Sequence, residues 1–459
     1  MSDTTPGTDA PDPRPRVRVV IVNYNGGADT LACLDSVLAS DWPAEDLEVV
    51  LVDNASVDGV AAKVKAGLPR VSVVESGRNR GFAGGCNLGL NDLSEVDYVA
   101  LVNNDATVDA GWLAPLVAAL EDDPGVGAAS PRILFRDTFV DLEVASPTCA
   151  RGRGDRRQLG VRLSGARLDG TDALGRLQLV DGFWGLEHGT GSESSYQWTA
   201  GAAHMRVPVR GDGTLPSLEL HLAADSDRVA TLTSGPNTVE HQVTSTPAWV
   251  TVPLGGTPHQ VVNNVGSVLV TDGYGADRGY HEPDGPQFER PDEVFAWCGA
   301  AVLLSRDYLE SVGLFDEAFF LYYEDFDLSW RGRAQGWRYV YVPDSVVHHV
   351  HSASSVEGSR LFAHYVERNR LLTLTRNAPL GFTARAAVRY LLITGSYARR
   401  DILSPVAHTR PPNFETVRRR LRAFGGYGRL LPGALAGRRR LRRRRTVGDP
   451  EILAWLTER

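Results

Sequence analysis

Near the start of the chain stands Val17-Arg18-Val19-Val20-Ile21-Val22-Asn23-Tyr24, a run rich in β-branched residues. Such a run is typical of a strand that is buried on both faces of a parallel sheet. Residues 28–39 follow with apolar side chains at helical spacing, and a second buried run at 48–53 ends in the carboxylate of Asp53. The order strand, helix, strand predicts the start of an α/β domain.

The alternation of strands and helices continues to residue 102. We expect further strands at 71–74 and 98–102, and helices at 57–66 and 84–93. This order predicts a doubly wound, mainly parallel sheet, in which ligands bind at the carboxyl ends of the strands.

The pattern changes near residue 136, where short segments of alternating polarity such as 217–222 appear between Gly and Pro turns. These features indicate an inserted all-β, sandwich-like module. Its tryptophans, Trp184, Trp198 and Trp249, could stack on sugar rings, although burial in the sandwich is the commoner use of such residues.

The α/β pattern then returns, with expected helices at 306–312 and 325–335, a strand at 338–342 and helices from 360 to about 398. We therefore divide the chain into five parts. They are an N-terminal tail at 1–16, two halves of one α/β domain at 17–135 and 263–359, the β-rich module at 136–262, and a helical, Arg-rich segment at 360–459.

Composition gives the class of protein. With 459 residues, 42% hydrophobic and 23% charged, the chain can form two or three globular units. Its four cysteines lack C-x-x-C spacing, which favours a reducing compartment, and no apolar run reaches the roughly 20 residues of a spanning helix. We expect a protein that is cytoplasmic or attached to the inner face of a membrane.

The net charge of −8 hides a basic C-terminal end, with seven arginines between Arg438 and Arg445. This run is either a solvated tail or a contact for an anionic membrane surface. Nucleic acid is not expected as a partner, because the run has no interleaved aromatic residues.

Two polar sites follow predicted strands and so face the same crevice. Asp53 can accept a hydrogen bond from a ribose hydroxyl or a base, or it can cap a helix. Asn103-Asn104-Asp105 can hold a divalent cation that neutralises a diphosphate, or form a simple β-turn.

Three further segments carry candidate chemistry. A Gly-rich loop at 79–87 opens a helix and suits binding of an anion. Glu324, Asp325 and Asp327 lie among aromatic residues, where burial and mutual repulsion would raise carboxyl pKa values as a general base requires. A helix start with acids in its first turn is the alternative, which fits Asp327 but explains Glu324 and Asp325 less well. His348, His349 and His351 follow an expected turn at 343–344, either as metal ligands or as residues of a surface loop.

Taken in order, these segments resemble family 2 of the glycosyltransferases, with a GT-A fold, and within it the bacterial rhamnosyltransferase-like branch. The resemblance covers 17–135 and 263–379. It rests on the following motifs: Val22-Asn23-Tyr24-Asn25, 52–56, 79–87, 320–328, and Gly336-Trp337 with Pro343.

The resemblance implies roles for individual residues. Asp53 would contact the nucleoside, Asp105 would be the remaining acid of an Asp-x-Asp motif, Asp325 beside Glu324 would be the catalytic base, and His349 would join Asp105 on Mg or Mn. The chain departs from the pattern at Asn103, where many relatives have an acid, which puts the strength of metal binding in doubt.

Two sets of binding residues follow from the same resemblance. The residues expected to bind the nucleotide-sugar are Asn23, Asn25, Asp53, Asn54, Asn79, Arg80, Gly81, Phe82, Asn104 and Asp105. Those expected to contact the acceptor are Trp297, Cys298, Gly299 and Arg278, close to a mobile segment at 263–267.

The implied activity is an inverting, metal-dependent transfer of a sugar from a nucleoside diphosphate to a glycan or polyprenyl-linked glycan of a cell wall or surface polysaccharide. Thymidine-diphosphate rhamnose is the favoured donor, and a uridine-diphosphate sugar the second. An alternative is a non-catalytic protein that binds carbohydrate or nucleotide-sugar. A processive synthase is disfavoured, because the chain has neither spanning helices nor a Gln-x-x-Arg-Trp segment.

Overall fold

The computed structural model describes residues 14–152, 155–187, 195–350, 359–407 and 411–458. These residues form two units. The first holds the described residues up to 134, residues 263–279 and those from 286 onward, and the second holds 135–262 and 280–285.

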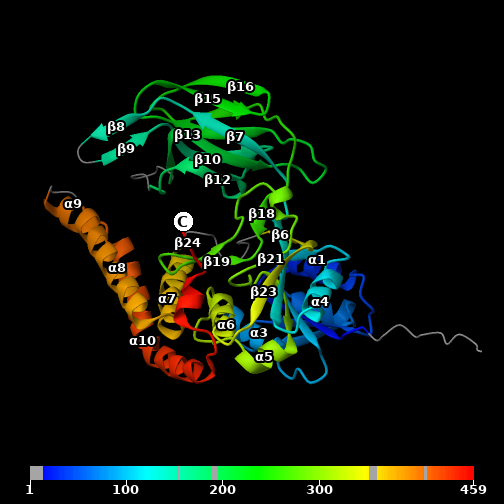
Figure 1. Cartoon of the computed structure of the whole chain (residues 1–459). Helices are drawn as coiled ribbons and strands as arrows, with labels where there is room; N and C mark the ends of the chain where they lie inside the picture. Colours follow the sequence, from blue (N-terminus) through cyan, green and yellow to red (C-terminus); the bar gives the residue numbers. More distant parts are fainter. Residues whose placement is uncertain (1–13, 153–154, 188–194, 351–358, 408–410, 459) are drawn as a thin grey trace, which may run out of the picture. The chain divides into compact units, whose positions relative to one another are not determined.

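The first unit is built on a mixed sheet whose strands follow the order β21-β23-β6-β22-β4-β1-β2-β3 (Figure 1). Strands β1 to β4 are parallel, whereas β22 runs antiparallel to both β4 and β6. The strands of this sheet are β1 Val17–Asn23, β2 Leu47–Asp53, β3 Val71–Glu75, β4 Tyr98–Asn103, β5 Ala106–Val108, β6 Val126–Phe135, β18 Val262–Asn264, β21 Asp292–Glu293, β22 Ala301–Ser305 and β23 Arg338–His349.

Helices flank this sheet and share its core. They are α1 Gly27–Leu38, α2 Val60–Gly67, α3 Gly81–Gly89, α4 Leu113–Glu121, α5 Arg306–Val312 and α6 Glu324–Arg333. Every residue of β1 is buried, as its β-branched composition predicts, and Leu34 of α1 and Leu116 of α4 pack in the same core. Helix α3 begins three residues before the expected start and ends four before the expected end.

The parallel register brings the ends of three strands together. Asn23 at the end of β1 pairs with Asp53 of β2, and Val22 pairs with Asn103 of β4. The polar residues that follow these strands therefore lie at one edge of the sheet, as expected for an α/β ligand site.

The turn expected at 343–344 is wrong. Strand β23 continues through Pro343 to His349, and its last three residues pair with β5, with His349 opposite Ala106. The backbone carbonyl of Pro343 accepts hydrogen bonds from Arg132 of β6. Proline has no N–H to donate to a neighbouring strand, so it interrupts a strand only where that hydrogen bond is required. Strand β23 continues through Pro343.

The second unit is all-β and confirms the inserted module of the predicted fold class. Its main sheet is antiparallel, in the order β16-β15-β7-β13-β10-β14-β17, and encloses a core that includes Val144, Met205 and Leu220. The strands are β7 Phe139–Ala145, β8 Cys149–Gly152, β9 Asp155–Leu159, β10 Arg162–Leu168, β11 Thr171–Asp172, β12 Gln178–Phe183, β13 Gln197–Pro208, β14 Leu218–Ala223, β15 Arg228–Ser234, β16 Asn237–Val243 and β17 Ala248–Val252.

The three tryptophans of this module differ in burial. Trp198 is fully buried, Trp184 is half-buried, and Trp249 is 37% exposed with Arg167 over its ring. Burial in the core therefore accounts for only one of the three.

The C-terminal part of the first unit is helical. It comprises α7 Arg360–Asn377, α8 Leu380–Ala398, the π-helix η3 Arg399–Leu403, α9 Ser404–Ala407, α10 Glu415–Arg444 and α11 Asp449–Leu453, after which β24 Leu456–Thr457 pairs with β19 Ser267–Val270. Within the described residues, the helices are too short or too polar to cross a membrane.

The reading of Arg438–Arg445 as a solvated tail is wrong. All but the last of these residues belong to α10, and the buried guanidinium of Arg438 donates to the carbonyl oxygens of Thr375 and Ala378 at the end of α7. The arginine run is thus the end of a packed helix.

Candidate active site

Asp53 ends β2 with an unpaired oxygen. Its carboxylate is 9% exposed, and Oδ1 is buried without a hydrogen-bond partner. A buried carboxylate oxygen without a donor is costly, and a ligand hydroxyl or N–H would satisfy it. Asp53 is therefore available to a ligand at the edge of the sheet.

The asparagines next to this carboxylate already have protein partners. The Asn23 Oδ1 accepts from the Thr30 hydroxyl at 2.8 Å and from the Gly26 N–H at 3.0 Å, and Asn104 Nδ2 donates to the same Thr30 hydroxyl. Asn23 is fully buried, so its side chain joins β1 to α1 rather than facing a ligand. Asn25 is exposed and accepts from the Val57 N–H at 2.8 Å.

The Gly-rich loop is held from within by two amide side chains. Asn54 accepts from the Arg80 N–H at 2.8 Å and donates to the Gly81 carbonyl at 3.0 Å, while Asn79 accepts from the Gly81 N–H. Gly81 has φ +70°, and a Cβ there would lie 2.1 Å from the Phe320 carbonyl oxygen. Only glycine allows this loop to approach the segment before α6 so closely.

Asp105 and His349 lie side by side, because β5 pairs with the end of β23. Asp105 Oδ1 is 3.1 Å from His349 Nε2, and both side chains are about nine-tenths buried. His349 Nδ1 lies 3.0 Å from Asn263 Oδ1. His348, on the opposite face of the strand, pairs instead with Asp109 at 3.3 Å; His351 lies outside the described residues.

The contacts of His349 suit a metal ligand. An amide oxygen only accepts, so the Asn263 contact suits a proton on Nδ1 of His349, and Nε2 is the ring nitrogen that faces Asp105. Two acceptors 3.1 Å apart would be stabilised by a cation between them, and neighbouring ligands about 2.1 Å from an octahedral ion lie about 3 Å apart. Among the described residues no group of three or more His, Cys, Asp or Glu could hold a metal.

The acids Glu324 and Asp325 begin α6. Asp325 accepts from the Gly299 N–H at 2.9 Å through Oδ2 and from the Phe326 N–H at 2.7 Å through Oδ1. Burial raises the pKa of Asp325 above its ordinary value, although these amides partly offset the rise. Burial and then the charge of Asp325 raise the pKa of Glu324 further, and Glu324 Oε2 is buried without a partner. Of the two carboxyls, Glu324 is thus the one whose pKa is raised further, so it holds its proton more strongly than Asp325.

The loop before α6 has a strained backbone. Phe320, Tyr322 and Tyr323 have φ values of +65°, +65° and +72°, a region that bulky residues rarely adopt. The fully buried Asn369 of α7 directs its amide nitrogen at the carbonyl oxygens of Phe319, Leu321 and Tyr322, at 2.9, 2.8 and 2.7 Å. One side chain of α7 therefore holds the loop that positions Asp325.

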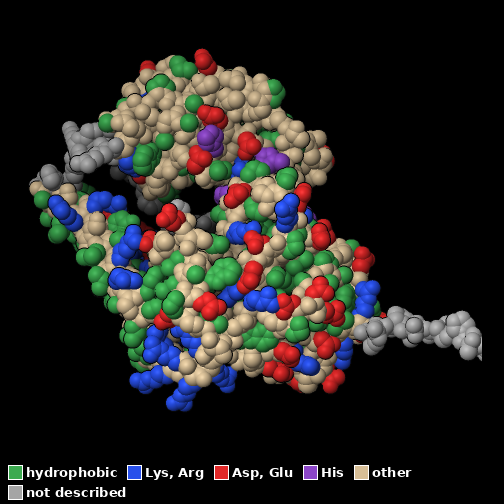
Figure 2. All heavy atoms as spheres, in the orientation of Figure 1, with side chains coloured by type: hydrophobic (Ala, Val, Ile, Leu, Met, Phe, Trp, Pro, Cys, Tyr) green, Lys and Arg blue, Asp and Glu red, His purple; other side chains and the backbone are tan. Residues whose placement is uncertain are grey.

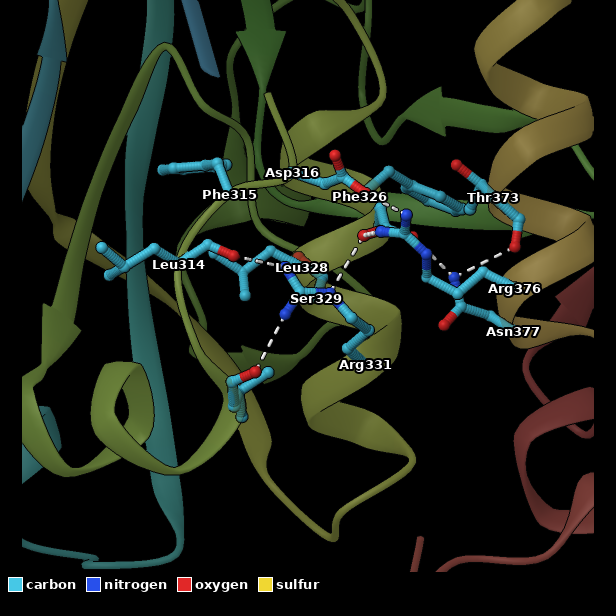
Figure 3. Close-up of polar contacts among 12 residues, drawn as sticks. Leu314, Phe315, Asp316, Phe326, Leu328, Ser329, Arg331, Thr373, Arg376 and Asn377 are labelled. Carbon is cyan, nitrogen blue, oxygen red and sulfur yellow. Dashed lines mark hydrogen bonds and ion pairs between the residues drawn. The ribbon is translucent and has the colours of Figure 1, made fainter. Parts of the chain in front are cut away.

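A second contact fixes α6 to α7 (Figure 3). Asp327 is fully buried and accepts from Arg331 at 3.0 Å, Arg376 at 2.7 Å and Asn377 at 2.9 Å. Arg376 also pairs with Asp316 in the segment before α6. Because the buried charge is fully paired, removal of one partner would leave an uncompensated ion.

The four residues expected at the acceptor lie in different environments. The Trp297 ring is fully buried and packs edge-on against Phe315, so it is not available to an acceptor. Cys298 is half-buried and Gly299 touches Asp325, whereas Arg278 pairs with Asp292 at 2.9 Å. Of the expected acceptor contacts, Gly299 touches Asp325, and Cys298 lies close enough to both acids that their charges, after burial, raise the pKa of its thiol.

Two family models match the chain. Glycosyl transferase family 2 matches residues 18–176, and Glycosyl transferase family group 2 matches residues 241–393. The chain belongs to glycosyltransferase family 2.

Individual relatives of this family 2 chain match over shorter stretches. The N-acetylglucosaminyl-diphospho-decaprenol L-rhamnosyltransferase of Mycobacterium tuberculosis is 38% identical over 124 residues, which is 25% of this chain and 40% of that protein. The uncharacterized glycosyltransferase YibD of Escherichia coli is 29% identical over 127 residues, 27% of this chain and 36% of its own length. The match thus spans well under half of these curated relatives.

Solved structures are similar at low identity. A mannosyltransferase from Pyrobaculum calidifontis with GDP-Man and Mn2+ has a TM-score of 0.41 at 15% identity, covering 91% of this chain and 88% of that one. GalNAc-T7 with UDP, GalNAc and Mn2+ also has a TM-score of 0.41 at 15% identity, covering 79% and 48%.

Several residues of the family 2 site were not found from the sequence. Asp58 accepts from the Gly27 and Val60 N–H groups and fixes the start of α1, and its place just after β2 was an available signal. Asn263, expected in a mobile segment, is instead a buried residue of β18 that contacts His349. Asn369 gave no local signal, because its role depends on contacts 47 to 50 residues away.

Proposed function

We propose that this chain is an inverting, metal-dependent glycosyltransferase that uses a nucleoside diphosphate sugar. The observation that carries the proposal is the Glu324–Asp325 pair, in which one carboxylate is held by two backbone amides and its neighbour has a higher pKa. Two adjacent carboxyls with separated pKa values suit a site where one of them acts as a base.

Asp325 is the base in this mechanism. It takes the proton of an acceptor hydroxyl, whose oxygen forms a bond to the anomeric carbon of the donor while the bond from that carbon to the diphosphate oxygen breaks. The proton ends on Asp325, the nucleoside diphosphate leaves, and attack opposite the leaving group inverts the anomeric configuration. A raised pKa brings Asp325 closer to the working pH and makes it a better base.

The donor would lie at the edge formed by β1, β2 and β4. Asp53, with its unpaired oxygen, would accept from the nucleoside, and the Gly-rich loop at 79–87 would border the diphosphate. Asp105 and His349 would hold Mg or Mn, which when bound neutralises charge on the leaving diphosphate.

Rhamnose from thymidine-diphosphate rhamnose is the proposed donor sugar, with a uridine-diphosphate sugar as the second choice. The mycobacterial relative is named for L-rhamnosyl transfer to a decaprenol-linked sugar, which supports rhamnose and a polyprenyl-linked glycan of the cell wall or surface as acceptor. We also propose that the helical, Arg-rich segment from residue 360 attaches the protein peripherally to an anionic membrane on the cytoplasmic side.

A non-catalytic nucleotide-sugar-binding protein is the competing proposal. Asn103 favours it, because an amide replaces an acid next to His349. The two proposals differ in turnover.

The test incubates the chain with thymidine-diphosphate rhamnose or uridine-diphosphate sugars, Mn or Mg, and a polyprenyl-linked acceptor, and measures nucleoside diphosphate release. Release by wild type and its loss in Asp325→Asn would support the transferase. Binding of the donor by both proteins without release would support the binding protein instead.

A further inference from the structure

The outer side of α8 and α9 exposes an unusual number of apolar side chains. Inward-facing Tyr390 and Thr394 are buried against α10, where the Tyr390 hydroxyl donates to the Arg420 carbonyl. The opposite side carries what we call the α8 face, which consists of Val388, Leu391, Leu392, Leu403 and Val406, each at least 43% exposed.

Helical spacing groups these side chains. Val388, Leu391 and Leu392 are three and four residues apart on one side of α8, and beyond the π-helix η3 Val406 lies three residues after Leu403. Phe414, which precedes α10, and Leu421 of α10 add further exposed apolar side chains, at 56% and 53%. Single exposed apolar residues are ordinary, but a contiguous set of this size indicates a contact surface.

The surroundings of the α8 face are basic. The described residues between 380 and 422 contain eight arginines and two acids, Asp401 and Glu415. Two of these arginines are paired with acids outside this range, the buried Arg420 with Glu367 and Arg389 with Asp272, and the other six set the charge of this surface. Both acids are already paired with arginines, Arg400 and Arg360. Figure 2 shows apolar and basic side chains together along the edge that α8 occupies in Figure 1.

We propose that the α8 face docks on the surface of an anionic lipid bilayer. Aliphatic side chains would enter the interface while flanking arginines reach the phosphates, as in amphipathic helices that lie in the membrane plane. The excess of arginine selects an anionic surface, and none of the described helices can cross the bilayer, so the contact is peripheral. This inference deepens the proposed membrane attachment and assigns it to α8 instead of to Arg438–Arg445.

The test measures sedimentation of the full chain with vesicles, a readout that is independent of sugar transfer. Vesicles of phosphatidylcholine with about one-third phosphatidylglycerol are compared with pure phosphatidylcholine. The variant Leu392→Ser with Leu403→Ser removes two side chains that are 70% and 63% exposed, and Leu186→Ser, 57% exposed in the other unit, is the matched control.

Wild type and the control should bind anionic vesicles equally, and the double variant at least tenfold more weakly. Leu392→Trp should bind more tightly than wild type, because tryptophan favours the membrane interface, so a loss of folding cannot imitate the result.

Three outcomes would overturn the proposal: absent vesicle binding by wild type, unchanged binding by the double variant, or sedimentation-velocity data in which the α8 face holds a dimer. Loss of binding on replacing Arg439, Arg440, Arg442 and Arg443 by Gln, with α8 variants unaffected, would return the contact to the arginine run. Transfer to a water-soluble acceptor should be unchanged in all these variants.

Discussion

Replacement of Asn369 by leucine tests whether α7 positions the catalytic base. Leucine has a similar branched shape but no donor, so the carbonyl oxygens of Phe319, Leu321 and Tyr322 lose the amide of Asn369. The Phe319 oxygen keeps Arg368 as a donor, so the loss falls mainly on the other two. Each buried acceptor left without a partner costs about 1–3 kcal/mol. Against this, three residues at positive φ store about 1–2 kcal/mol each, which the loop recovers if it relaxes.

If the loop relaxes, the strain that it releases nearly offsets the cost of the lost hydrogen bonds. The change in stability is therefore expected to be small. The free energy of unfolding should fall by only about 1–3 kcal/mol, because relaxation offsets most of the lost hydrogen bonding. Relaxation moves the backbone that leads directly into Glu324 and Asp325, so kcat should fall about 10- to 100-fold while KM for the donor changes less than about threefold.

Steady-state transfer kinetics and thermal unfolding measure both effects. The matched control is Thr373→Val on the same helix, because the Thr373 hydroxyl is buried without a partner and its loss should change neither quantity. A kcat of Asn369→Leu within about threefold of wild type, in a folded protein, would refute the positioning role.

The remaining predictions concern the acids themselves. Asp325→Asn should reduce kcat by at least about 1000-fold and leave donor affinity by calorimetry within a few fold, since a base acts in the transition state; activity within about tenfold of wild type would remove Asp325 from this role. Asp105→Ala should abolish the effect of Mn on donor affinity, whereas Asp53→Ala should weaken donor binding with and without metal; equal metal dependence in both variants would contradict the assignment. Because the folded-state pKa of Glu324 is raised, its proton stabilises the fold below the unfolded pKa of about 4.3, and this stability is lost as pH rises through the folded pKa. The difference in melting temperature between Glu324→Gln and wild type is therefore measured in acid and taken as the reference. As the pH rises, the melting temperature of the variant should increase relative to that of wild type, and a difference that stays constant with pH would disprove the prediction.

The local sequence was sufficient to predict the elements of the α/β sheet. The composition of β1 predicts burial, and the order of the elements places Asp53, Asp105 and the Gly-rich loop after parallel strands. What the local sequence could not show is which polar side chains are already satisfied. Asn23 ends β1 and Asn54 follows Asp53 at the end of β2, yet both asparagines are buried and bonded to protein atoms, while Asp53 retains an unpaired oxygen.

Long-range pairing explains the other differences. The turn expected at 343–344 is absent because β6 and β5 supply partners for β23 from more than 200 residues away in the sequence. The same pairing selects His349 over His348 as the neighbour of Asp105, because successive residues of a strand point to opposite faces. The sequence alone could not decide which of the three histidines at 348, 349 and 351 lies beside Asp105, because that depends on the register of the strand.

The C-terminal helices belong to the first unit, together with the candidate active site, which bears on how membrane attachment can be tested. Arg438 bonds to the end of α7, and Ile452 and Trp455 pack near Phe295 and Trp330 of the core beside α6. A chain ending at Leu435 would lose these contacts, and α7 is the helix that holds both the strained loop and Asp327. Truncation would thus impair catalysis whether or not the segment binds lipid, whereas outward substitutions at Leu392 and Leu403 separate the two functions.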